Sequence, residues 1–217
     1  EMLRSLVGSE MCIRDRWIAH IKTLGGERKY VEPAKGTVNP RVFIDRLAKK
    51  MPANVTVVAD VGQNQIWTCT EYKFRKEGRL LTSGGMGTMG YSVPAAIGAK
   101  MADNSRATVA ICGDGAFQMS FMELATAVQF GVDIKVVVMT NNRLGMVREL
   151  QTNGYHDRQT AVFLDGSPDF IKLAEAYGIP AMRVYDDDTM EKGVEMLAEH
   201  KGICLVEVVV DKDMPTL

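Results

Sequence analysis

The chain has 217 residues, 46% of them hydrophobic, which is enough for one folded domain with a short appendage. Its formal net charge at pH 7 is -1 and its acids and bases are interspersed, so neither nucleic acid nor an anionic membrane surface is expected as a partner. No apolar run approaches the roughly 20 residues that span a bilayer, so no membrane segment is expected.

The cysteines argue against a disulfide framework and against a zinc site. Cys12, Cys69, Cys112 and Cys204 are far apart and form no C-x-x-C pair. This spacing favours a reducing, cytoplasmic setting. The three histidines are too few for a histidine-rich metal site.

The first residues carry no helical or strand periodicity. Leu6–Asp15 reads LVGSEMCIRD and lacks the apolar core of a signal peptide. This stretch resembles the translation of a transposase-type sequencing adapter, so we expect residues 1–16 to be an assembly artefact; a natural tail is the alternative. Residues 17–36 are mixed, charged and contain glycine, and we interpret them as a linker from a missing upstream domain.

From residue 37 the sequence alternates helices and strands. Asn39 and Pro40 predict a helix start, because Asn is a favoured N-cap and Pro is favoured at the first helical position. Further helices are predicted over residues 91–101 and 117–130, after Ser167-Pro168-Asp169, and over residues 187–200. Short apolar, β-branched runs predict strands at residues 55–59, 80–83, 107–112, 134–140 and 203–210. This alternation predicts an α/β fold, a parallel sheet of about six strands with helices on both faces.

Polar, glycine-bearing segments follow four of the predicted strands. They cover residues 60–65, 83–90, 113–116 and 140–145. In parallel sheets, ligands bind outside the carboxyl ends of the strands. One glycine turn would mean little, but four such loops on the same sheet edge predict a binding site.

The third and fourth loops form the strongest pattern. Asp114 follows one predicted strand and Asn141 follows the next, so a carboxylate and an amide oxygen are expected side by side. Mg²⁺ takes about six oxygens, often one or two carboxylates plus phosphate and water. Asp114, Asn141 and a carbonyl near Arg143 supply three of them. The alternative is a helix cap and a turn, each worth about 1 kcal/mol, which explains either residue alone but not the whole pattern.

The segments around these loops resemble those of thiamine-diphosphate-dependent enzymes, and among them the acetolactate synthase family. The similar segments are Asp60–Trp67 (DVGQNQIW), Ser83–Ala99 (SGGMGTMGYSVPAAIGA), Gly113–Gln129 (GDGAFQMSFMELATAVQ) and Asn141–Gln151 (NNRLGMVRELQ). The resemblance covers about Thr37–Leu217. It implies the thiamine-diphosphate-binding fold and identifies residues 37–217 as the C-terminal domain of a large subunit.

The resemblance also implies a role for each matching residue. Asp114, Asn141 and the carbonyl of Arg143 would bind Mg²⁺. Two side chains and several backbone groups would approach the diphosphate, namely Gln63, Asn64, Gly113, Gly115, Ala116, Leu144, Gly145 and Met146. Many relatives have His at the position of Asn64.

Other positions would hold the rest of the cofactor and the second substrate. The Gly87 carbonyl and the Met89 amide would hold the aminopyrimidine, and the side chains of Met89 and Met119 would keep the cofactor bent. Ordinary core filling is the alternative for both methionines. Leu150 would face the second substrate, where many relatives have Trp, a residue tied to a preference for 2-oxobutyrate.

The implied activity is decarboxylation of pyruvate and ligation of the hydroxyethyl unit to a second 2-oxoacid, in branched-chain amino acid biosynthesis. Pyruvate oxidase, glyoxylate carboligase and 2-oxoacid decarboxylase are alternatives. The family's catalytic glutamate and its FAD are expected on missing N-terminal and middle domains, so this chain alone is expected to be inactive. A full-length homodimer or homotetramer is expected, with a regulatory small subunit as a further partner.

Two readings from other classes compete with this one. Gly85–Gly90 matches the G-x-G-x-x-G of nicotinamide-binding domains, but that motif requires an acid at the end of the next strand, and the first acid there is Asp114. A non-catalytic assembly domain is the other reading, and the intact Asp114 and Asn141 argue against it.

Overall fold

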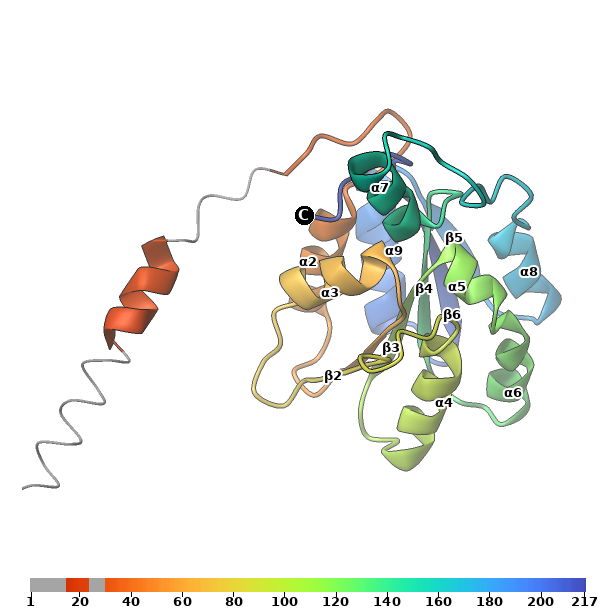
Figure 1. The fold of residues 1–217 in the computed structure, drawn as a ribbon. Coiled ribbons are helices and arrows are strands. Elements are labelled where there is room, and N and C mark those ends of the chain that lie inside the picture. Colours follow the sequence, from red (N-terminus) through yellow and green to blue (C-terminus); the bar gives the residue numbers. More distant parts are fainter. Residues whose placement is uncertain (1–14, 24–29) are drawn as a thin grey trace, which may run out of the picture. The chain divides into compact units, whose positions relative to one another are not determined.

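The computed structural model describes residues 15–23 and 30–217 (Figure 1). The chain divides into two compact units, residues 1–31 and residues 32–217. In the first unit, residues 15–23 form a helix, which the sequence reading of residues 17–36 as a linker did not predict. The proposed artefact at residues 1–16 lies outside the described residues except for its last two.

The second unit is a six-stranded parallel sheet in the order β2-β1-β3-β4-β6-β5. The strands are β1 (Thr56–Ala59), β2 (Arg79–Thr82), β3 (Thr108–Gly113), β4 (Lys135–Thr140), β5 (Ala181–Val184) and β6 (Cys204–Val209). The helices are α2 (Pro40–Lys50), α3 (Gln63–Glu71), α4 (Ser92–Ala102), α5 (Asp114–Gln118), η1 (Phe121–Glu123), α6 (Leu124–Gln129), α7 (Gly145–Gly154), α8 (Phe170–Ala176) and α9 (Asp187–Glu199). The predicted fold class is confirmed.

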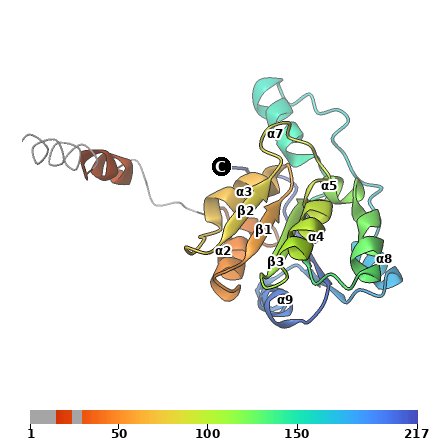
Figure 2. The ribbon, with the colours of Figure 1, turned by 90° about the horizontal axis from the view of Figure 1, so that it is seen from below.

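Alternate residues of the strands belong to two hydrophobic layers, one on each face of the sheet. Val57 belongs to the layer that contains residues of α2, α3 and α9, whereas its neighbour Val58 belongs to the layer that contains residues of α4, α5, α6 and α8. Figure 2 shows α2 and α3 on one side of the strands and α4 on the other. Because both faces are covered, every residue of β1 and β4 is buried.

Helix starts follow the predicted chemistry. The Asn39 side chain accepts from the backbone N–H groups of Arg41 and Val42 at 2.9 and 3.4 Å, and Pro40 is the first residue of α2. The Asp169 side chain caps α8 in the same way. Within the described part of the chain, no helix has the length and apolarity needed to cross a membrane.

Three elements differ from the sequence prediction. β5 was not predicted, because this edge strand carries Arg183 and has only one fully buried residue. The single helix expected over residues 117–130 is three short pieces, since Ser120 leaves the helical region with φ -143°. α3 begins at Gln63, inside the segment 60–65 that was expected to be a loop.

Candidate functional site

A pocket lies at the carboxyl ends of β1, β3 and β4. Twelve of the predicted site residues line it: Gln63, Asn64, Met89, Gly113, Asp114, Gly115, Ala116, Asn141, Arg143, Leu144, Gly145 and Met146. Gly87, Met119 and Leu150 are not among the lining residues. The structure therefore brings together the residues of three of the four predicted loops, together with Met89 of the fourth.

Asp114 is the central acid of this pocket. It is the first residue of α5 and is only 2% exposed. One carboxylate oxygen accepts from the backbone N–H groups of Asn141 and Asn142 at 3.1 and 2.7 Å, and the other accepts from Gly115 at 2.8 Å. Asn142 has φ 54°, a backbone conformation that Asn tolerates well. These contacts join the ends of β3 and β4, as the sequence predicted.

The environment of Asp114 acts on its pKa in two directions. Burial raises the pKa to about 6, and hydrogen bonds from backbone N–H groups, including those of Gly115, Asn142 and Asn141, oppose that rise. A cation near the carboxylate would favour the ionised form.

Asn141 lies beside Asp114 and contacts the start of α3. Its Oδ1 accepts from the Arg143 N–H at 3.1 Å, and its Nδ2 donates to Gln63 Oε1 at 3.2 Å. Gly145 lies against this pair: a Cβ there would be 1.9 Å from Gln63 Oε1. A side chain at position 145 would therefore force the Gln63 amide to move.

The first turn of α7 opens into the same pocket. Its first residues, Gly145, Met146 and Val147, line the pocket, and no side chain caps the helix at Leu144. The first N–H groups of a helix have no partner within the helix and carry its positive end. Such N–H groups are suited to bind an anion, and these lie in the same pocket as the Asp114 carboxylate.

The amide groups of Gln63 and Asn64 are already occupied by protein partners. Gln63 Nε2 donates to Glu149, Met214 and Thr216 at 3.0–3.2 Å. Asn64 Nδ2 donates to the carbonyls of Asp60 and Ile111 at 2.8 and 3.2 Å. In this arrangement the side-chain amides of Gln63 and Asn64 therefore donate to protein groups and not toward a ligand.

The loop 83–90 is held to β1 by Asp60, which the sequence analysis did not single out. The fully buried Asp60 carboxylate accepts from the backbone N–H groups of Gly90 and Ser92 at 3.0 and 2.7 Å. Gly87 in this loop has φ 63°, which glycine adopts readily. In the sequence, the signal for this anchoring role was the acid at the start of the DVGQ segment, Asp60.

The oxygen-rich set suits a hard cation. In the described residues, no three His, Cys, Asp or Glu side chains cluster, as a zinc-type cage would require. Asp114 and Asn141 instead offer one carboxylate and one amide oxygen beside an anion site. Mg²⁺ is typically held by one or two carboxylates together with phosphate oxygens and water, and the donors fit that pattern.

The fold and the pocket define a class of protein, an α/β domain that binds a phosphorylated cofactor at the strand ends. Residues 60–208 match the family model "Thiamine pyrophosphate enzyme, C-terminal TPP binding domain". The chain belongs to this family.

Named relatives narrow the comparison. The chain is 39% identical over 185 residues to the mitochondrial acetolactate synthase catalytic subunit of Aspergillus candidus, covering 84% of this chain and 26% of that protein. It is 38% identical over 181 residues to the acetolactate synthase large subunit of Lactococcus lactis, covering 83% and 31%. It is 43% identical over 157 residues to the acetolactate synthase of Arthrospira platensis, covering 71% and 27%. The chain thus spans about a quarter to a third of the length of these relatives.

Proposed function

We propose that this chain holds the diphosphate of thiamine diphosphate, together with Mg²⁺, in an acetolactate synthase of branched-chain amino acid biosynthesis. That enzyme would decarboxylate pyruvate and ligate the two-carbon unit to a second 2-oxoacid. The observation that carries the proposal is the pairing of Asp114 and Asn141 beside the uncapped start of α7. The names of the relatives favour acetolactate synthase over pyruvate oxidase, glyoxylate carboligase and 2-oxoacid decarboxylase.

Each group at the pocket has a distinct task in this proposal. Asp114, Asn141 Oδ1 and the Arg143 carbonyl would hold the cation, whose charge offsets that of the diphosphate. The N–H groups of Gly145 and Met146 would donate to diphosphate oxygens. The absence of side chains at Gly113 and Gly115 lets the ligand approach the backbone, alongside Ala116 and Leu144.

Residues outside the diphosphate pocket would hold the remainder of the cofactor and the substrate. When bound, thiamine diphosphate supplies an electron sink for carbanion chemistry. The Gly87 carbonyl and the Met89 amide would fix its aminopyrimidine, and Met89 and Met119 would support its bend. Met119 is 57% exposed, so its side chain is available for a ligand or another domain.

Further proposals concern the subunits, the second cofactor and the compartment of the full-length enzyme. Its relatives are called catalytic or large subunits, which supports a full-length oligomer, either homodimer or homotetramer, with a regulatory small subunit. FAD would bind to the middle domain of the full-length protein and not to this chain. The free thiols Cys69, Cys112 and Cys204 fit a reducing compartment, with the cytoplasm the one we expect.

The test is Asp114→Ala, which removes the only acid among the residues lining the pocket. Titration calorimetry with thiamine diphosphate should show binding to the unchanged chain that requires Mg²⁺ and disappears in EDTA. The variant should lose this Mg²⁺-dependent binding, because the charge of the diphosphate is no longer neutralised. Equal affinity in the two proteins would remove the metal assignment.

A further inference from the structure

Residues 211–217 lie across the starts of α2 and α3, and side chains from both helices hold them. Arg41 donates to the Thr216 carbonyl at 2.6 Å, and the indole N–H of Trp67 donates to the Pro215 carbonyl at 3.1 Å. We call residues 211–217 the strap. It is far from the metal loop in sequence but is built into the edge of the same site.

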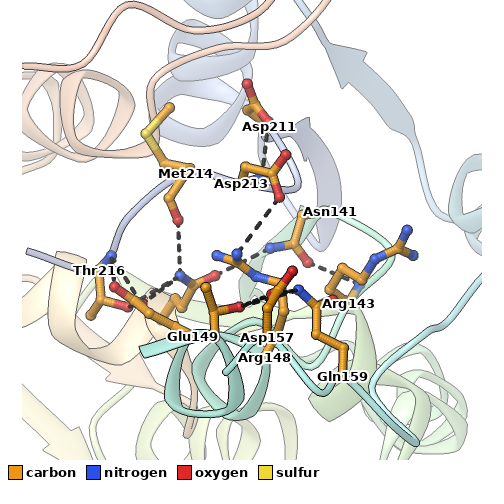
Figure 3. Close-up of polar contacts among 12 residues, drawn as sticks. Asn141, Arg143, Arg148, Glu149, Asp157, Gln159, Asp211, Asp213, Met214 and Thr216 are labelled. Atoms are coloured by element: carbon orange, nitrogen blue, oxygen red, sulfur yellow. Dashed lines mark hydrogen bonds and ion pairs between the residues drawn. The ribbon is translucent and has the colours of Figure 1, made fainter. Parts of the chain in front are cut away.

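The strap and α7 together fix the orientation of one side-chain amide. Gln63 Nε2 faces three acceptors: Glu149 Oε2 at 3.2 Å, the Met214 carbonyl at 3.0 Å and Thr216 Oγ1 at 3.1 Å. The Glu149 carboxylate also accepts from the N–H and the hydroxyl of Thr216, so its oxygens are held in place (Figure 3). The Met214 carbonyl can only accept a hydrogen bond, and the Glu149 carboxylate oxygen lies beside it, so the NH₂ end of Gln63 faces these acceptors.

This orientation is passed on to Asn141. With its NH₂ end toward Glu149, Gln63 presents Oε1 to Asn141 and accepts from Asn141 Nδ2 at 3.2 Å. Asn141 Oδ1 is then left on the side of Arg143, where it accepts from the backbone N–H at 3.1 Å. If the Asn141 amide turned over, an NH₂ group would replace the oxygen, and an NH₂ group repels a cation.

We propose that Glu149 is a positioning residue for the metal site: acting through Gln63, it selects the oxygen of Asn141 as the atom that faces the cation. The inference rests on the proposed function, because it concerns the same Mg²⁺ site. Glu149 does not line the pocket and is not a ligand. Outer partners that orient metal ligands typically change metal affinity by about 10–100-fold.

The competing explanation is that Glu149 only fastens the strap. Asp213 provides a matched control, because its replacement by Asn also removes one acid from a strap contact. The Asp213 carboxylate lies 3.6 Å from the guanidinium of Arg148, the neighbour of Glu149 on α7. No hydrogen bond or ion pair joins Asp213 to Gln63, so Asp213→Asn removes one strap contact and none of the three acceptor groups that face the Gln63 amide.

The experiment is a double-mutant cycle on the purified 217-residue chain, read as affinity for the Mg²⁺ complex of inorganic pyrophosphate by titration calorimetry. We expect Glu149→Met to weaken binding about tenfold, and Asp213→Asn to leave it within about twofold. In a Gln63→Met background, Glu149→Met should have no further effect, because the relay is already broken. Melting temperatures check that each variant is folded.

Each result decides a different question. If the unchanged chain does not bind Mg²⁺-pyrophosphate, the proposed function fails and takes this inference with it. If the unchanged chain binds, two results overturn the inference alone. One is that Glu149→Met binds as tightly as the unchanged chain. The other is that Glu149→Met weakens binding by the same factor whether position 63 is Gln or Met. Should Glu149→Met be unfolded, Glu149→Gln replaces it. That variant keeps one acceptor, so we expect a loss of about threefold, and an unchanged affinity would count against the proposal.

Discussion

At the scale of single residues, Asp114 combines nearly complete burial with a carboxylate that the backbone already surrounds. Burial raises its pKa to about 6, from an ordinary value of 3.8. The folded metal-free chain therefore holds this proton over a pH range in which the unfolded chain has released it. The stabilising contribution is fully present below the ordinary pKa and is lost as the pH rises through about 6.

This linkage predicts a pH-dependent melting temperature. The quantity to follow is the melting temperature of the metal-free chain minus that of the Asp114→Asn variant. Between pH 4.5 and pH 7.5 this difference should fall by about 2–4 °C, which corresponds to a loss of roughly 1 kcal/mol in the free energy of unfolding. The variant carries no titratable group at this position, so the subtraction removes the effect of the other titrating groups. Mg²⁺ with thiamine diphosphate should offset the loss above pH 6. A difference that does not change with pH would contradict the raised pKa.

Leu150 carries the prediction about substrate choice. It is 61% exposed on α7, so its side chain is not needed to pack the helix against its own domain. In the full-length enzyme, Leu150→Trp should raise the preference for 2-oxobutyrate over pyruvate as second substrate, because Trp offers a broader apolar wall. One methylene is worth about 10–200-fold in discrimination. Product ratios from a competition assay measure the change; an unchanged ratio in an active variant would rule out contact with the second substrate.

At the scale of elements, the start of α7 brings the anion site and the Gln63–Asn141 contact together. Gly145→Ala should weaken thiamine diphosphate binding at least tenfold, because its Cβ would lie 1.9 Å from Gln63 Oε1 and 3.1 Å from Asn141 Nδ2. Gly154→Ala, at the other end of the same helix, meets nothing within 4 Å and is the matched control. Calorimetric titration of both variants tests the prediction, and equal affinities would contradict it.

The sequence predicted most of the elements, because apolar runs and helix caps are local signals. The strands before Asp114 and Asn141 were expected to be neighbours, and β3 pairs with β4. β5 was missed because an edge strand with Arg183 lacks a continuous apolar run. Glu149 and Thr216 could not be predicted as partners of Gln63, since nothing local marks hydrogen bonds across 86 and 153 residues.

At the scale of the whole molecule, we expect the pocket to bind the cofactor and to depend on another domain for acid–base chemistry. Asp114 is the only acid among its lining residues, and we assign it to the cation. We therefore predict that the 217-residue chain binds thiamine diphosphate and Mg²⁺ but forms no acetolactate from pyruvate. A colorimetric acetolactate assay, run on samples whose cofactor binding has been verified, measures this. Product above the level of the Asp114→Ala control would contradict the prediction.

The position of the strap also bears on how the molecule folds. Gln63 and Thr216 are 153 residues apart, and the strands β2 to β6 lie between them in the sequence. Closing a loop of that length costs conformational entropy before any contact repays it, and such non-local topologies fold slowly. We therefore expect the contacts that orient Asn141 to form late in folding, so that a chain collapsed around its central strands would not yet capture the cofactor.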